Sequence, residues 1–289
     1  MSDSHEVQST PVSVPIRRLS VDDLPSCLRL AEDRSWPREE PKWRLLFEIG
    51  EVYGIDDPDG GLAGAVVSTR YGREVAAISM MLVARRHERR GLGSRLMAHA
   101  LEQSGTAGAW LTATDYGRPM YERLGFRTIS QCATYTGQLQ PQAGDPPRPS
   151  SRPMVSADFP AVLALDAEVF GARRAVLLTR MPSFSGQLRV VDGPEGIVGY
   201  GCARRTVDST ALGPLIAADT TTALALLADL AAAVEGPVRL DLMHRRPELT
   251  AWTEARGLRC GFTTAVMVHG DPPPGDPARL FAAAMLALG

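Results

Sequence analysis

The two halves of this chain match each other, and this internal repeat restricts the possible folds more than any other feature of the sequence. The chain has 289 residues, and two separate segments of its second half repeat residues of its first half at one offset of 135. The identical pairs are Asp23 with Asp158, Pro25 with Pro160, Leu28 with Leu163, Leu30 with Leu165, Gly61 with Gly196, and Gly64 with Gly199. Two segments that share one offset indicate a duplicated domain.

The match continues toward the end of each half with small losses of register. AISMMLV (77–83) corresponds to ALGPLIA (211–217) at an offset of 134, and YERLGF (121–126) corresponds to TEARGL (253–258) at an offset of 132. Because deletions are tolerated in loops, the shrinking offset is consistent with a duplication.

A proline-rich segment divides the chain between the two copies. Residues 140–153 contain five prolines and no apolar period, which predicts a linker. Residues 1–13 are polar and aperiodic, which predicts a disordered tail. We therefore expect two domains, at residues 14–139 and 154–289.

Hydrophobic periodicity in the first half predicts a mixture of strands and helices. Strands are expected over 14–19, 51–55, 62–70, 75–84, 109–114 and 126–139, and helices over 22–35, 37–49, 118–124 and a segment that ends near 104. This order predicts an α+β (mixed α/β) fold, in which each domain has a mixed, mostly antiparallel sheet covered by helices. The strand over 126–139 is expected to complete the first half.

Composition and charge argue against several function classes. With 31 Lys+Arg against 33 Asp+Glu, the formal charge of −2 gives no field suited to nucleic acid or to an anionic membrane. Asp219 and Asp229 interrupt the longest apolar stretch, residues 210–234, so no membrane span is expected. Asp3 and Glu6 lie where a secretion signal would be basic and then apolar, so we expect a cytoplasmic protein.

Cysteines and histidines provide no metal-binding pattern. The four cysteines are far apart without a CxxC pair, and we expect buried thiols rather than disulfides or a zinc site. No two of the five histidines have a metal-ligand spacing, so no metal is expected. These residues are Cys27, Cys132, Cys202 and Cys260, and His5, His87, His99, His244 and His269.

The segment ARRHERRGLGSRLM (84–97) carries the strongest chemical signal, because it follows an apolar strand and opens a helix. Free N–H groups at a helix N-terminus, with glycines that permit close approach, form an anion site. Leu96 lies where a dinucleotide fingerprint has its third glycine, and the Gly-Lys-Ser/Thr ending of a P-loop does not occur in the sequence. A solvated basic turn remains the alternative.

This arrangement of strand, (Gln/Arg)-x-x-Gly-x-(Gly/Ala) loop and helix resembles the acetyl-CoA pyrophosphate loop of the GNAT superfamily of acyl-CoA N-acyltransferases. TATDYGRPMYERLGF (112–126) resembles the second conserved segment of that family, which ends in Tyr-x-x-x-Gly-Phe. The resemblance covers residues 14–139, and the whole chain is similar to tandem GNAT proteins whose second copy has degenerated. One residue departs from the pattern, since Glu88 lies where the family usually has Gln or Arg.

The resemblance implies acetyl-CoA as the acyl donor and assigns its binding residues. In the family, the strand before the loop splays from its neighbour, and its free backbone groups bind the pantetheine arm and polarise the thioester carbonyl. The expected binding residues are Met81, Leu82, Val83, Glu88, Arg89, Arg90, Gly91, Leu92, Gly93 and Ser94. Leu82 is the expected catalytic backbone position, and Tyr121 matches the residue that commonly protonates the departing CoA thiolate. The alternative for Tyr121 is an aromatic side chain that only packs its helix on the sheet.

The implied activity is N-acetyl transfer to a primary amine. We expect direct attack in a ternary complex because no cysteine lies in either motif. The acceptor is expected to be a small molecule rather than a protein, and the chain a monomer or homodimer. The alternative function is a non-catalytic CoA-responsive binding or regulatory module.

Several acidic residues are candidates for the base that takes the amine proton. Those near the two early helices are Glu32, Asp33, Glu39, Glu40, Glu48 and Glu51, and Asp115 follows a later strand. Surface ion pairs and, for Asp115, a helix cap are the competing interpretations.

The second copy lacks the loop glycines and arginines, and Thr253 replaces Tyr121. We therefore expect the second copy to support the first or to shape its acceptor site. Thr220, Thr221 and Thr222 could cap the helix that follows its loop. FGARR (170–174) is the best candidate to reach a substrate, and a surface salt bridge is the alternative.

Overall fold

The computed structural model describes residues 14–140, 151–244 and 246–289. The expected tail and residues 141–150 of the expected linker lie outside this part of the chain. No helix among the described residues is long and apolar enough to cross a lipid bilayer.

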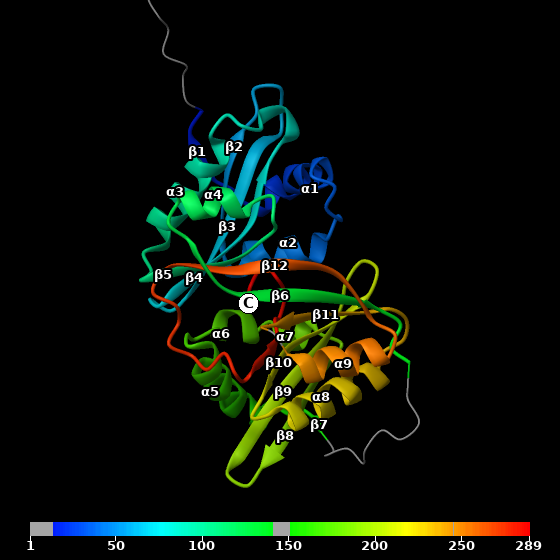
Figure 1. The fold of residues 1–289 in the computed structure, drawn as a ribbon. Helices are drawn as coiled ribbons and strands as arrows, with labels where there is room; N and C mark the ends of the chain where they lie inside the picture. The colour runs from blue at the N-terminus through cyan, green and yellow to red at the C-terminus, as the bar shows by residue number, and fades with distance from the viewer. Residues whose placement is uncertain (1–13, 141–150, 245) are drawn as a thin grey trace, which may run out of the picture.

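Both halves contain a similar succession of strands and helices, which confirms the mixed α/β fold (Figure 1). The first half contains β1 (Ile16–Arg18), α1 (Leu24–Asp33), α2 (Glu40–Ile49), β2 (Glu51–Asp56), β3 (Leu62–Tyr71), β4 (Val75–Val83), α3 (Leu92–Ser104), β5 (Gly108–Ala113), α4 (Arg118–Arg123) and β6 (Arg127–Gly137). The second half contains β7 (Arg152–Pro153), α5 (Phe159–Phe170), α6 (Ala175–Leu178), α7 (Met181–Phe184), β8 (Gln187–Gly193), β9 (Gly196–Arg205), β10 (Thr210–Ala217), α8 (Thr220–Ala232), β11 (Val238–Met243), α9 (Pro247–Ala255), β12 (Arg259–Gly270) and β13 (Leu280–Ala282).

The duplication extends to individual side-chain contacts. In the first half, the Arg17 guanidinium donates to both Asp23 and Asp56. In the second half, Arg152 donates in the same way to Asp158 and Asp192. Arg152 lies in β7, which pairs with β8, so the end of the expected linker belongs to the second domain's sheet.

The strands β6 and β12, which are equivalent in the two halves, are exchanged between them. The described strands form one 13-stranded sheet in the order β1-β2-β3-β4-β5-β12-β6-β11-β13-β10-β9-β8-β7. β12 pairs with β5, and β6 pairs with β12 and β11, all antiparallel. Figure 1 shows β6 and β12 crossing the middle of the molecule, between the helices of the two halves. The expectation that residues 126–139 complete the first half is therefore wrong. A duplicated chain offers two equivalent sheet edges, and local sequence does not distinguish between them.

Helices cover the first-half sheet on opposite faces. Val67 of β3 packs with residues of α1 and α2, whereas Val66 packs with Leu96 and Met97 of α3. Because neighbouring strand residues point to opposite faces, the two helical layers bury the strand from both sides.

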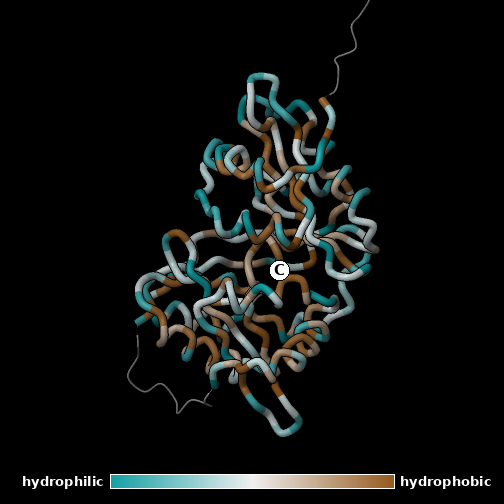
Figure 2. Tube along the Cα trace, turned by 180° about the vertical axis from the view of Figure 1, so that it is seen from behind, coloured by the Kyte–Doolittle hydropathy of each residue, from teal (hydrophilic) through white to brown (hydrophobic). Residues whose placement is uncertain are grey.

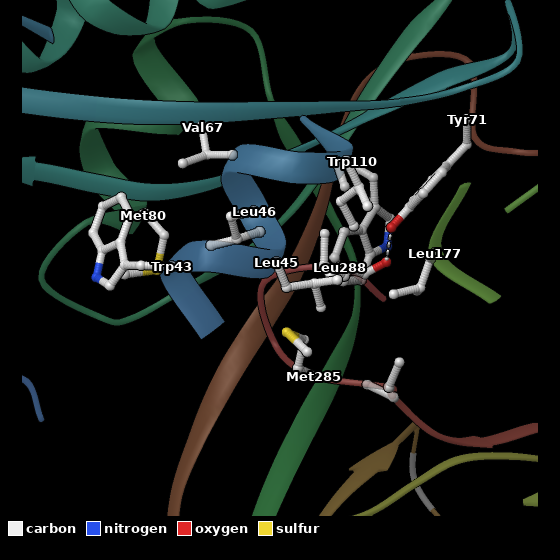
Figure 3. Packing of buried hydrophobic residues seen from close by; sticks show 14 of the residues in the cluster. Trp43, Leu45, Leu46, Val67, Tyr71, Met80, Trp110, Leu177, Met285 and Leu288 are labelled. Atoms are coloured by element: carbon white, nitrogen blue, oxygen red, sulfur yellow. Dashed lines mark hydrogen bonds between the residues drawn. The ribbon is translucent and has the colours of Figure 1, made fainter. Parts of the chain in front are cut away.

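The C-terminal segment passes through the middle of the molecule. Met285 and Leu288 are buried, and the hydropathy colouring shows apolar segments around the C-terminus (Figure 2). These two residues belong to one buried cluster with Trp43 of α2, Trp110 of β5 and Leu177 of α6 (Figure 3). The Tyr71 hydroxyl donates to the Leu288 carbonyl over 2.9 Å. The segment thus joins the cores of the two halves.

Candidate active site

Strands β4 and β5 separate where the sequence predicts the site. They pair in parallel only at Val75–Gly108, Ala76–Ala109 and Ala77–Trp110, although β4 continues to Val83. No β4–β5 pairing is formed beyond Ala77 in the described chain. The register against β3 shifts in the same stretch of β4, and Met80 has a φ of 47°. A bulge of this kind turns backbone and side chains away from regular pairing, so β4 presents an unpaired edge.

The loop after β4 leads directly into the N-terminus of α3. Gly91 is the N-cap of α3 with a φ of 77°, and Arg89 has a φ of 60°. Glycine adopts this left-handed conformation without a steric penalty. His87 lies 2.6 Å from Asp57, and Arg86 Nε donates to the same carboxylate over 2.8 Å. Two side chains of the loop are therefore anchored to the β2–β3 turn, while the following backbone stays open.

A cavity of about 760 Å³, here called the loop cavity, lies along this unpaired edge and the start of α3. Nine of the expected binding residues line it, namely Met81, Leu82, Val83, Glu88, Arg89, Gly91, Leu92, Gly93 and Ser94. Arg90 is exposed outside this lining, with its guanidinium 3.4 Å from His87 Nδ1. The cavity therefore combines an apolar strand edge with the free N–H groups of a helix start.

Tyr121 of α4 also lines the loop cavity. Its side chain is 8% exposed, and its ring packs edge-on against Phe126 with centroids 5.8 Å apart. Its hydroxyl makes no hydrogen bond to another described residue. Burial raises the pKa of Tyr121 to about 12, so the phenol is protonated at neutral pH.

The negative charge of Glu88 is compensated at the cavity wall. Arg34, which follows α1, forms an ion pair with Glu88 and lies over the ring of Tyr116, 5.7 Å from its centroid. The Arg34 hydrogen bond holds the pKa of Glu88 below its usual range. The loop motif points to Glu88 but to neither Arg34 nor Tyr116, because Arg34 and Glu88 are 54 positions apart in the chain.

A second cavity of about 340 Å³, here called the central cavity, adjoins the loop cavity. Six residues line both, namely Trp36, Ile78, Ser79, Met80, Thr112 and Thr114. The second half contributes Arg204, Thr206, Arg239, Asp241, Phe262, Thr264, Met285, Leu286 and Ala287. The two cavities thus meet at the unpaired part of β4, and the far wall of the central cavity comes from the second half.

The C-terminal segment is fixed in this wall by a hydrogen bond. The Thr112 hydroxyl of β5 donates to the Leu286 carbonyl over 2.9 Å. Met285, Leu286 and Ala287 therefore form a fixed apolar part of the central cavity.

Of the acidic residues considered as bases, Glu39 lines the central cavity, where it pairs with Lys42. Asp33 accepts from the Arg85 backbone, and Asp115 is exposed. The others pair elsewhere: Glu32 with Arg38, Glu40 with Arg44, Glu48 with Arg180, and Glu51 with Arg18 and Arg70.

Two further expectations need correction. Arg174 of FGARR does not reach a substrate site, because it is fully buried and donates to Asp166 over 2.6 Å. Cys27, Cys132 and Cys202 are buried, but Cys260 is exposed because it lies near the start of β12.

The second half repeats the strand separation but fills the gap. β10 and β11 pair in parallel only at Thr210–Val238 and Ala211–Arg239. β13 then pairs with both strands and occupies the space between them. Asp219, rather than one of the predicted threonines, caps α8 by accepting from the Thr222 N–H over 2.7 Å. The site equivalent to the loop cavity is therefore closed by the chain itself.

Family profiles match both halves of the chain. The profile of the Acetyltransferase (GNAT) family matches residues 19–126, and that of the Acetyltransferase (GNAT) domain matches residues 162–282. The uncharacterized N-acetyltransferase YitH of Bacillus subtilis (strain 168) is 27% identical over 278 residues, covering 94% of this chain and 97% of YitH. Holothin acyltransferase of Pseudoalteromonas sp. (strain SANK 73390) is 27% identical over 263 residues, covering 86% of this chain and 87% of that protein.

Solved structures share the architecture. A proposed acetyltransferase from Pyrococcus horikoshii superposes with a TM-score of 0.81 at 17% identity, covering 99% of this chain and 100% of that one. A tandem GNAT protein from the clavulanic acid biosynthesis pathway has a TM-score of 0.60 at 15% identity, covering 88% and 97% of the two chains. Matching profiles on both halves and the shared tandem architecture show that this chain belongs to the GNAT superfamily and is a tandem GNAT acyltransferase.

Proposed function

We propose that this protein transfers the acetyl group of acetyl-CoA to the primary amine of a small molecule. The observation that carries this proposal is the meeting of the two cavities at the unpaired part of β4, around Ser79 and Met80. A donor in the loop cavity and an acceptor in the central cavity would meet at one backbone edge. This arrangement suits a ternary complex.

The loop cavity fits the donor. The N–H groups at the start of α3 and the exposed Arg89 suit a pyrophosphate. The unpaired edge at Met81–Val83 suits the amides of a pantetheine arm, because its backbone groups need partners. An N–H of this edge, which we assign to Leu82, would stabilise the oxyanion formed on the thioester carbonyl.

The transfer step needs one acid and one base. The amine nitrogen forms a bond to the carbonyl carbon, and the carbon–sulfur bond then breaks. Tyr121 donates its proton to the CoA thiolate, and the excess proton of the amine passes to Glu39, directly or through water. Glu39 is suited to this role because its carboxylate lines the central cavity, where it lies beside Lys42.

The same geometry supports direct attack and a small acceptor. No cysteine lines either cavity among the described residues, so no thiol is placed to carry the acetyl group. A volume of about 340 Å³ lies in the range typical of small-molecule sites. We therefore favour a free amine over a protein, nucleic acid or membrane-bound acceptor. Our proposal also keeps the expectation of a monomer or homodimer.

A thiol-release assay with acetyl-CoA and a panel of small amines tests the proposal. We expect CoA release that depends on the amine and yields one N-acetyl product per CoA. Replacement of the four cysteines by Ala should leave this rate unchanged in a folded protein. Tight acetyl-CoA binding without CoA release for any amine would instead favour a CoA-responsive binding module.

A further inference from the structure

Arg204 is a charged residue of the central cavity that has neither a role in the proposed reaction nor an acidic partner. It lies in β9, lines the cavity, and is 5% exposed. Its Nε is buried without a hydrogen-bond partner, and Arg204 forms no ion pair with any described residue. Its guanidinium lies over the ring of Phe184, 5.3 Å from the centroid, which compensates the charge only in part.

The other two cations of the cavity each have an acidic partner. Lys42 pairs with Glu39, and Arg239 pairs with Asp241 over 3.0 Å. Asp241 also accepts from the Thr134 hydroxyl over 2.6 Å, so its carboxylate oxygens are already bound by residues of β6 and β11. The described lining therefore carries three cations and two anions, and the excess positive charge resides on Arg204.

A buried guanidinium without an anion is costly, because removal of its hydration is not offset by a partner. Burial lowers the pKa of Arg204, while the negative charge of Glu39 opposes that shift. A ligand that supplied a negative charge would recover the missing interaction, and a carboxylate matches the two-pronged geometry of a guanidinium.

We infer that the acetyl acceptor is an amino carboxylate, and that Arg204 binds its carboxylate group in the central cavity. This inference rests on the proposed function. The cavity extends from Arg204 to Ser79 and Met80, so a small acceptor anchored at one end would present its amine at the unpaired edge of β4. The Ser79 hydroxyl, buried and without a partner, provides a second polar contact at that end.

The test compares amino acids with their matched carboxamides as acceptors. The wild-type protein should show a kcat/KM at least about tenfold higher for each productive amino acid than for its carboxamide. The Arg204→Met variant should lose this preference mainly through a higher KM, while its KM for acetyl-CoA stays unchanged. Arg204→Lys should retain part of the preference, because it keeps the charge but not the planar fork.

Arg205 provides the matched control. It is the next residue of β9 and is exposed, so Arg205→Met should change neither acceptor preference nor KM. The melting temperature of Arg204→Met should not fall, because the variant removes a buried charge that has no partner. Equal use of amino acids and carboxamides by the wild type, or an equal loss for both in Arg204→Met, would overturn the inference.

Calorimetry in the presence of CoA separates this inference from the proposed function. We expect amino acids to bind the CoA-saturated protein and to bind Arg204→Met at least about tenfold more weakly. This result without any acetyl transfer would support the carboxylate site and refute the transferase proposal. Acetyl transfer to neutral amines alone would support the transferase proposal and refute the carboxylate site.

Discussion

Replacing Tyr121 by Phe should slow acetyl transfer by about 100-fold and leave the protein's stability nearly unchanged. A positioned general acid contributes about 100- to 10,000-fold. We expect the lower end, because burial raises the pKa of Tyr121 to about 12 and makes the phenol a weaker acid than usual. The hydroxyl has no hydrogen-bond partner among the described residues, so its removal should change the free energy of unfolding by less than about 0.5 kcal/mol.

Steady-state and binding measurements together test this prediction. The kcat of Tyr121→Phe should fall, while calorimetry gives the wild-type affinity for acetyl-CoA, because the hydroxyl acts on the leaving thiolate rather than on the bound thioester. Thr253→Ala is the matched control, since Thr253 is the equivalent residue of the second half and is fully buried. A Tyr121→Phe protein as fast as the wild type at all pH values would refute the general-acid role.

The same residue predicts a dependence of stability on pH. Because the pKa of Tyr121 is raised from 10.0 to about 12 in the folded protein, folding favours the neutral phenol. Its contribution to stability is therefore fully present below pH 10 and is lost as the pH rises toward 12. Urea unfolding should show a steeper loss of stability in that window for the wild type than for Tyr121→Phe. Parallel curves would contradict the burial of this phenol.

Four further substitutions test the loop and the domain core. Gly91→Val should weaken acetyl-CoA binding at least about tenfold by calorimetry, because a branched residue opposes the φ of 77° that shapes the helix start; unchanged affinity in a folded variant would reduce the loop to a simple turn. Glu88→Gln should tighten acetyl-CoA binding slightly by freeing Arg34 for the phosphates, whereas Arg34→Gln should weaken it by leaving Glu88 uncompensated. Weaker binding by Glu88→Gln and tighter binding by Arg34→Gln would mean that the ion pair positions the loop. Arg174→Met should lower the free energy of unfolding by about 3–5 kcal/mol, because it leaves Asp166 buried without its cation; an unchanged urea midpoint would contradict this account.

Local features of the first half could be predicted from sequence because their determinants lie within short segments. The apolar run of β4 ends at the glycines that start α3, and nine of the ten expected binding residues line the loop cavity. The exchange of β6 and β12 could not be predicted, because the duplicated halves provide equivalent edges at β5 and β11. Which strand pairs with which edge depends on contacts between residues far apart in the sequence, and hydrophobic patterns do not encode these contacts.

The central cavity was largely beyond sequence reasoning for the same reason. Arg204 and Asp241 come close to Ser79 only through the shared sheet, so no motif links them. A usable signal existed at Arg204, which ends the apolar run GYGCA (199–203) and precedes the exposed Arg205. A charge that continues an apolar strand often marks a buried or functional position.

The asymmetry between the halves predicts that one molecule of acetyl-CoA binds per chain. In the second half, β13 fills the gap between β10 and β11, and Ala217 donates to the Arg279 carbonyl over 3.1 Å. The Asp219 carboxylate occupies the N-terminus of α8, where a diphosphate would meet a like charge instead of free donors. Binding there would therefore require displacement of a paired strand and would bring two negative groups together.

Calorimetric titration of the full chain tests this stoichiometry. We expect one site per chain in the wild type, and no site of wild-type affinity in Gly91→Val, because the loop cavity belongs to the first half and β13 fills the equivalent gap in the second. Asp219→Ser should keep a stoichiometry of one, since the strand β13 still closes the gap after the charge is removed. Two equivalent sites per chain, or a residual site of full affinity in Gly91→Val, would show that the second half opens in solution and that the paired β13 strand is too weakly held to exclude the nucleotide.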